Sequence, residues 1–150
     1  MPWCARRCAG ASWKNVKKIA DTGLIVGALL RNDRYHAWAM QVFHQRAPFY
    51  VCDAVVSEAA SFCPDPRGVL ELLARGELIF DRAFVLADEL PRVLALAAKY
   101  ADHPMDLADA CLVRMSELAA HCRIWTIDRA DFSSYRRHGR ERIPCEFPPE

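Results

Sequence analysis

Four acidic residues far apart in the chain, Asp21, Glu58, Asp109 and Asp128, have side chains that could act together on a phosphodiester bond. Asp109 follows Asp106 by three residues, so the two carboxylates share one face of the helix expected there. Asp21 and Asp128 each stand at the end of a predicted strand. Glu58 falls within an apolar helical pattern, where a lone buried carboxylate would be unfavourable. The chemistry therefore depends on whether the fold brings these side chains together.

Predicted strands and helices alternate along the chain, with no internal repeat and no low-complexity tract. This order predicts an α/β protein: a three-layer α/β/α sandwich with a central, mostly parallel sheet of four to five strands. The strands are expected at 14–20, 49–52, 77–80, 123–127 and around 143–144. The helices are expected at 22–30, 34–46, 54–62, 66–74, 88–100 and 105–121, followed by a short turn around 131–132 and a basic tail with Arg136, Arg137, Arg140 and Arg142.

The tips of parallel strands meet at the carboxyl edge of a sheet, where sites lie in open α/β folds. Asp21, Glu58 and Asp128 are expected at this edge. Asp109 joins them only if its helix starts at the same edge, which periodicity alone does not supply.

Converging carboxylates would create a strongly negative pocket. At about 5 Å, each pair repels by about 3 kcal/mol at an effective dielectric constant of about 20. Such a cluster must hold protons or bind a cation, and oxygen ligands favour Mg²⁺ or Mn²⁺ over zinc. A metal ion in this position would orient a phosphate, acidify the attacking water and stabilise the leaving oxygen. Thr22 and Thr126 could orient the carboxylates as hydrogen-bond donors.

The acids stand in local motifs that resemble those of the PIN-domain ribonucleases, and among these the VapC-type toxins of bacterial toxin–antitoxin pairs. The motifs are Asp21-Thr22-Gly23 after a lysine-bearing strand, Glu58 in Val-Val-Ser-Glu-Ala, Asp109 in Leu-Ala-Asp-Ala-Cys-Leu-Val, and Thr126-Ile127-Asp128-Arg129 with Asp131-Phe132. The late Tyr135-Arg136-Arg137-His138-Gly139-Arg140 with Ile143-Pro144 is also similar. The resemblance covers about residues 16 to 145.

The resemblance implies a PIN-like fold and a Mg²⁺- or Mn²⁺-dependent endoribonuclease that cleaves RNA. It implies that Asp21, Glu58, Asp109 and Asp128 are the catalytic acids and metal ligands. Independently of the resemblance, we expect Thr22, Thr126 and Asp106 to support them. The resemblance also implies a homodimer and a cognate antitoxin that occludes the site, often through a basic side chain. The chain departs from the family in a less apolar first strand and in residues 1–14, which have no counterpart.

The composition fits one globular domain of ordinary apolar content, 53% in 150 residues. We expect a flexible extension over 1–14, a PIN-like nuclease domain over 15–146 and a short tail over 147–150. No apolar run could span a bilayer, and the basic first residues lack the apolar centre of a secretory signal. The seven scattered cysteines indicate reduced thiols in a cytoplasmic protein. Cys4 and Cys8 could be half of a zinc site, but no second pair matches them.

Other interpretations stay open at this point. Asp21, Asp128 and Asp106 could be helix caps or partners of the helix dipole. Basic residues could follow a phosphate backbone or be solvated surface. They are Lys14, Lys17, Lys18, Arg31, Arg34 and the group from Arg136 to Arg142. The chain could be a non-catalytic PIN-like module that binds RNA or protein. A phosphatase of the haloacid-dehalogenase type is disfavoured, because that class needs Asp-x-Asp after its first strand and Asp21 is followed by Thr22-Gly23.

Overall fold

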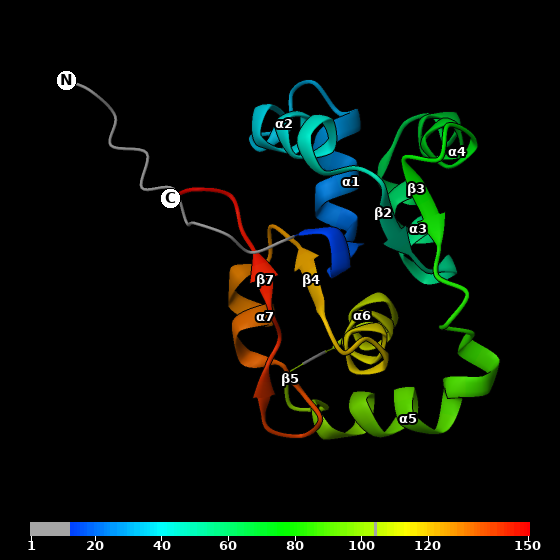
Figure 1. The fold of residues 1–150 in the computed structure, drawn as a ribbon, viewed down its shortest axis with the longest axis vertical. Coiled ribbons are helices and arrows are strands. Elements are labelled where there is room, and N and C mark those ends of the chain that lie inside the picture. Colours follow the sequence, from blue (N-terminus) through cyan, green and yellow to red (C-terminus); the bar gives the residue numbers. More distant parts are fainter. Residues whose placement is uncertain (1–12, 104) are drawn as a thin grey trace.

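The computed structural model describes residues 13–103 and 105–150 and contains a central five-stranded parallel sheet (Figure 1). The strand order is β3-β2-β1-β4-β7, and every neighbouring pair is parallel. The predicted α/β class with a mostly parallel sheet is therefore confirmed. The strands are β1 (Lys17–Ala20), β2 (Phe49–Val51), β3 (Leu78–Phe80), β4 (Cys122–Trp125) and β7 (Cys145–Glu146).

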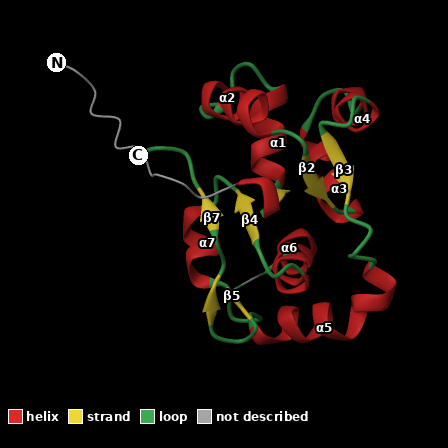
Figure 2. Ribbon diagram, in the orientation of Figure 1, coloured by secondary structure: helices red, strands yellow, loops and turns green. Residues whose placement is uncertain are grey.

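Seven helices flank the sheet in the described residues, as a three-layer α/β/α sandwich requires (Figure 2). A short 3-10 turn, η1 (Trp13–Asn15), precedes β1. The helices are α1 (Thr22–Leu29), α2 (His36–Arg46), α3 (Asp53–Phe62), α4 (Arg67–Ala74), α5 (Leu86–Lys99), α6 (Leu107–Leu118) and α7 (Arg129–Ser134).

The core lies on both sides of β1, the middle strand of the sheet. Ile19 is fully buried and is aligned with Tyr50 of β2 on one side and Ile124 of β4 on the other. Helices close over it with fully buried apolar side chains, Ile25 from α1 and Met115 from α6 among them. Each such side chain contributes about 1.5–3 kcal/mol through burial.

The connections place a topological switch point beside β1. From β1 the chain continues outward to β2 and then β3, and later returns to add β4 and β7 on the opposite side. The loops after β1 and β4 lie next to each other at the carboxyl edge, joined by the hydrogen bond from Thr126 to Asp21. Ligands of open α/β folds bind at this edge, at such a switch point.

Two elements near the carboxyl terminus were not predicted. The expected turn around 131–132 is the helix α7, and the expected basic tail contains an antiparallel hairpin of β5 (Arg136–Arg137) and β6 (Glu141–Arg142). The hairpin turns through His138 and Gly139, with φ of 50° and 80°, a region that favours glycine. A six-residue helix and two-residue strands are too short to give a periodic signal.

The two ends of the chain were predicted as a flexible extension over 1–14 and a short tail over 147–150. The expected flexible extension lies outside the described residues, apart from the 3-10 turn that starts at Trp13, and Cys4 and Cys8 lie outside them too. The tail packs on the domain, because the Arg129 guanidinium lies 4.6 Å from the Phe147 ring and donates to the Pro148 carbonyl at 3.0 Å. The cysteines of the described residues, Cys52, Cys63, Cys111, Cys122 and Cys145, are free thiols.

Within residues 13–103 and 105–150, every helix is too short or too polar to cross a membrane.

Candidate functional site

Asp21 occupies the end of β1 at the switch point and is 6% exposed. Its carboxylate caps α1 by accepting the Thr22 amide at 2.6 Å, and Thr126 donates its hydroxyl to the other oxygen at 2.5 Å. Burial raises the pKa of Asp21 to about 6, the negative charges of Glu58 and Asp128 act in the same direction, and the two hydrogen bonds oppose them. Asp21 is therefore both the cap of α1 and a member of the acidic cluster.

Gly23 explains how the first turn of α1 comes so close to the loop after β4. A Cβ atom at this position would lie 2.7 Å from Cδ1 of Ile127 and still closer to Cγ1. Only a residue without a side chain fits this contact without displacing Ile127. The Asp-Thr-Gly motif is therefore a packing requirement that brings Asp21 within reach of Thr126.

Glu58 lies in α3, which begins where β2 reaches the carboxyl edge. The Thr22 hydroxyl donates to its carboxylate, so Glu58 and Asp21 are linked through one threonine. Burial raises the pKa of Glu58, the Thr22 hydrogen bond opposes this shift, and the nearby Asp106 carboxyl raises the pKa further. Asp106 is also the cap of α6, where it accepts the Asp109 amide at 2.8 Å.

Asp109 stands in the first turn of α6 and belongs to the same cluster. Because α6 leads into the start of β4, its own start lies at the carboxyl edge, which was the step missing from the sequence argument. Burial raises the pKa of Asp109 to about 7, and the charges of Asp106 and Asp21 add to the shift. The Tyr135 hydroxyl donates to its Oδ2 at 3.0 Å.

Asp128 follows β4 and is bound into the loop beside Asp21. Its amide donates to the Thr126 hydroxyl at 3.0 Å, and its carboxylate accepts the Asp131 amide at 2.9 Å, which caps α7. Burial raises the pKa of Asp128, and the Asp131 carboxylate contributes to the increase. Asp128 is therefore the cap of α7, one of the two roles expected for it. Its role as a metal ligand stays a prediction. Asp131 in turn pairs with His103 at 2.6 Å.

The donor chemistry of this edge fits a hard divalent cation, since the converging side chains are carboxylates and hydroxyls. The spatial arrangement of these side chains favours metal binding less than their chemistry does. Among the described residues, no group of three or more His, Cys, Asp and Glu side chains is positioned to hold a metal ion. The carboxylates are instead held individually by hydroxyl and amide donors.

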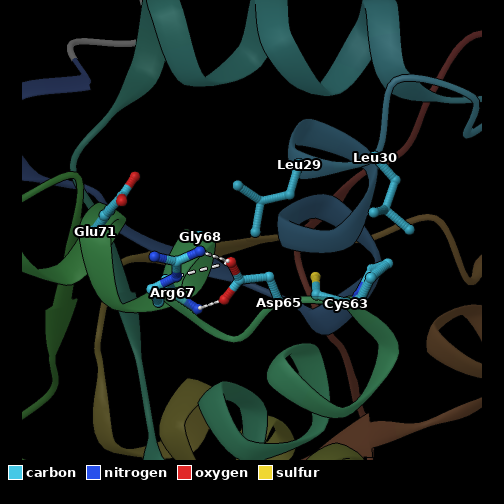
Figure 3. Close-up of a pocket in the computed structure, with 8 residues that line it drawn as sticks. Leu29, Leu30, Cys63, Asp65, Arg67, Gly68 and Glu71 are labelled. Carbon is cyan, nitrogen blue, oxygen red and sulfur yellow. Dashed lines mark hydrogen bonds and ion pairs between the residues drawn. The ribbon is translucent and has the colours of Figure 1, made fainter.

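A groove of about 530 Å³ opens beside the acids, between α3 and the start of α6. Glu58 and Asp106 line it together with the apolar side chains of Leu86, Leu107 and Ala108. A second cavity, of about 480 Å³, lies between the end of α1 and the start of α4 (Figure 3). Its walls include Leu29, Cys63 and the exposed Asp65–Arg67 pair and none of the four acids, so we do not associate it with the acidic edge.

Several basic residues that could have contacted an RNA backbone instead bind other groups of the protein. Lys17 pairs with the buried Asp81 at 2.9 Å, and Lys18 donates to the Arg46 carbonyl. Arg136 and Arg137 donate to backbone carbonyls. The exposed basic side chains among those considered are Lys14, Arg31, Arg34, Arg140 and Arg142.

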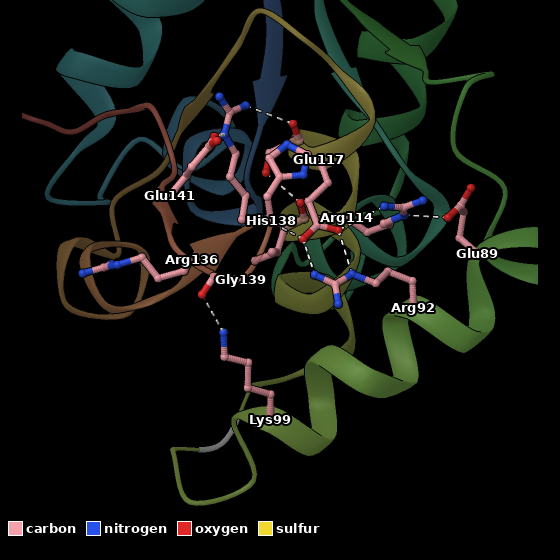
Figure 4. A network of polar contacts seen from close by, with 12 residues as sticks. Glu89, Arg92, Lys99, Arg114, Glu117, Arg136, His138, Gly139 and Glu141 are labelled. Carbon is pink, nitrogen blue, oxygen red and sulfur yellow. Dashed lines mark hydrogen bonds and ion pairs between the residues drawn. The ribbon is translucent and has the colours of Figure 1, made fainter.

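An ion-pair network around the buried Glu117 carboxylate anchors the hairpin that follows Tyr135 (Figure 4). The Glu117 carboxylate, on α6, accepts two hydrogen bonds from Arg92 of α5 at 2.5 and 2.9 Å, one from Arg114 at 3.0 Å and one from the His138 amide at 2.9 Å. These partners lower the pKa of Glu117 to about 2, against the opposing effect of burial. Neither this network nor the contact from Tyr135 to Asp109 was predicted, because Arg92, His138 and Tyr135 lie 25, 21 and 26 residues from their partners.

Neither a scan of the sequence against descriptions of known protein families nor a search of curated proteins gives a match.

Proposed function

We propose that this protein is a Mg²⁺- or Mn²⁺-dependent endoribonuclease of the PIN type. The observation that carries the proposal is the set of carboxylates from separate chain segments, Asp21, Glu58 and Asp109, gathered at the switch point, where burial and neighbouring acids raise their pKa values. Such an arrangement is unfavourable without a cation or bound protons, and perturbed acids of this kind concentrate at functional sites. The motif resemblance to PIN-domain ribonucleases supports the same assignment.

In the proposed reaction the protein supplies orientation and charge. Asp21, Glu58, Asp109 and Asp128 would hold the divalent ion, which when bound polarises the phosphodiester and lowers the pKa of the attacking water. Thr126 and Thr22 keep the Asp21 and Glu58 carboxylates from rotating away. With a pKa of about 7, Asp109 is partly protonated near neutral pH, so ion binding would release a proton from this side chain.

The biological setting we propose is the toxin of a toxin–antitoxin pair, acting in the cytoplasm as a homodimer. Apolar side chains are exposed on the edge strand β3 and on α5, with Phe80 at 43%, Leu90 at 54% and Leu94 at 66%, as expected for surfaces that a second copy or an antitoxin covers. The free thiols of the described cysteines fit a reducing compartment.

The direct test is cleavage of a labelled single-stranded RNA by the purified protein with Mg²⁺, with Mn²⁺ and with EDTA. We expect metal-dependent cleavage that falls at least 100-fold in Asp21→Asn and in Asp109→Asn, with Glu71→Gln, an exposed acid on α4, as the control. Cleavage that resists EDTA, or full activity in both site variants, would refute the proposal.

The toxin role is tested by induction in cells. Growth arrest with the wild-type chain but not with Asp109→Asn supports it, and sequencing of RNA ends after induction of both locates the cuts. Cleavage in vitro without growth arrest would leave an RNA-processing enzyme.

A non-catalytic PIN-like module that binds RNA or protein is the second candidate. The observation that favours it is the lack, among the described side chains, of a group of three or more arranged to ligate a metal. RNA binding without cleavage, unchanged by Mn²⁺, would support this candidate over the first.

A further inference from the structure

Tyr135 makes a contact with the acidic edge that the proposed reaction has not yet used. Its hydroxyl donates to Oδ2 of Asp109 at 3.0 Å, across 26 residues of sequence. Asp21 and Glu58 each accept one hydroxyl as well, from Thr126 and Thr22. Each of these three carboxylates therefore has a hydroxyl donor that fixes one oxygen, and the other oxygen of Asp21 accepts the Thr22 amide.

The surroundings of Tyr135 prevent its phenol from moving. The side chain is 0% exposed and is the largest of the fully buried ones. Three rings surround it edge-on, with centroids at 5.1 Å for Tyr100, 5.5 Å for Phe132 and 6.3 Å for His103. A ring packed in this way holds its hydroxyl in one place, so the carboxylate that accepts from it is held too.

The backbone of Tyr135 is held on both sides. Its amide donates to the Asp131 carbonyl at 2.9 Å at the end of α7, and the next amide, of Arg136, donates to the Tyr100 hydroxyl at 2.9 Å. The hairpin that follows is bound to α6 through the Glu117 carboxylate (Figure 4). Tyr135 is thus connected to α6 both through Asp109 and through the hairpin.

We propose that Tyr135 is the positioning residue of Asp109: its hydroxyl fixes the orientation of the Asp109 carboxylate at the acidic edge, so that this carboxylate can bind a divalent ion there. This inference rests on the proposed metal-dependent function and adds a residue to it. Removal of a donor that orients a metal ligand typically reduces metal affinity or activity 10- to 100-fold. The RNA-binding surface is unchanged by such a substitution, so the loss belongs in kcat and not in KM.

The test compares Tyr135→Phe with Tyr100→Phe. Both variants keep the ring and lose one hydroxyl, but the Tyr100 hydroxyl serves the Arg136 amide and not an acid. Mn²⁺ binding is followed through the electron paramagnetic resonance signal of the free ion, in protein first dialysed against a chelator. Thermal unfolding of each variant is recorded beside kcat and KM for RNA.

For Tyr135→Phe we expect Mn²⁺ affinity and kcat to fall at least 10-fold, with KM within twofold of the wild type. For Tyr100→Phe we expect both to stay within twofold, although its unfolding temperature decreases. Equal Mn²⁺ affinity in Tyr135→Phe and the wild type, or an equal loss in both variants, would overturn the positioning role alone. A wild-type protein that binds no Mn²⁺ would overturn the proposed function, and the positioning role with it.

Discussion

The clearest physical consequence of the acidic edge is that Asp21 destabilises the metal-free fold at neutral pH. Its pKa is raised from 3.8 to about 6 in the folded state, and the side chain is almost completely buried. Two pKa units at about 1.4 kcal/mol each give a penalty of about 3 kcal/mol when the group is ionised. Asp21→Asn removes the charge and should therefore stabilise the metal-free protein at high pH.

The sign of the pH dependence follows from the direction of the shift. An acid whose folded-state pKa lies above its unfolded value is penalised fully above the folded pKa, about 6, and not at all below the unfolded pKa, about 4. The wild type should therefore gain stability relative to Asp21→Asn as the pH falls from 8 to 4. The change in their difference should be about 3 kcal/mol, and any fixed effect of the amide on the Thr22 and Thr126 hydrogen bonds cancels from it.

Urea denaturation of both proteins at pH 8 and pH 4, in EDTA, measures this difference. Urea is uncharged and does not screen the carboxylates. Asp102→Asn, an exposed acid, is the control and should show no comparable change. A difference between wild type and Asp21→Asn that is the same at both pH values, within about 0.5 kcal/mol, would show that Asp21 is not held in a negative, desolvated environment.

Three further substitutions test the supports of the site by urea denaturation. Thr126→Val removes the donor to Asp21 and the acceptor of the Asp128 amide, so it should reduce the free energy of unfolding by about 1.5–3 kcal/mol. Thr126→Ser keeps the hydroxyl and should keep most of the stability. Equal stabilities of the two variants would refute the role of the hydroxyl. Gly23→Ala should reduce the free energy of unfolding by about 1–3 kcal/mol, because the new Cβ atom displaces Ile127. A second substitution, Ile127→Ala, should relieve this crowding. Additive effects of the two substitutions would contradict the packing argument. Glu117→Gln should reduce the free energy of unfolding by about 2 kcal/mol at pH 7. Because the pKa of Glu117 is lowered to about 2, the extra stability of the wild type is complete above about pH 4.5 and should shrink toward pH 2. A stability difference that does not change with pH would argue against the ion pairs as its source.

The α/β fold could be predicted from the sequence because its central elements carry strong local signals. Phe49–Val51 is an apolar run that forms a buried strand, and the helices around it have apolar positions at helical spacing. The boundaries were less accurate. The last strand is Cys145–Glu146, two residues later than expected, because Pro144 has no amide to donate and contributes its carbonyl to Ile124 instead.

The strand order and the long-range contacts could not be read from the sequence. Nothing local shows that β1 lies between β2 and β4, or that α6 begins beside Asp21. Thr22 and Thr126 were expected as donors because they adjoin the acids, and their hydrogen bonds to Glu58 and Asp21 are present. Tyr135 was noted only as the start of the late basic motif and not as a site residue, because no local pattern links it to Asp109, 26 residues away.

The pairing of β1 with β4 also determines when during synthesis the acidic edge can exist. Asp21 emerges early from the ribosome, but the threonine that holds it is 105 residues further along the chain. A nascent polypeptide that lacks β4 has its first acid and no partner for it, and the loop closure needed to join them is among the longest in this domain. A chain that stops before β4 therefore cannot assemble the acidic edge, and the proposed activity would begin only after Thr126 has been translated.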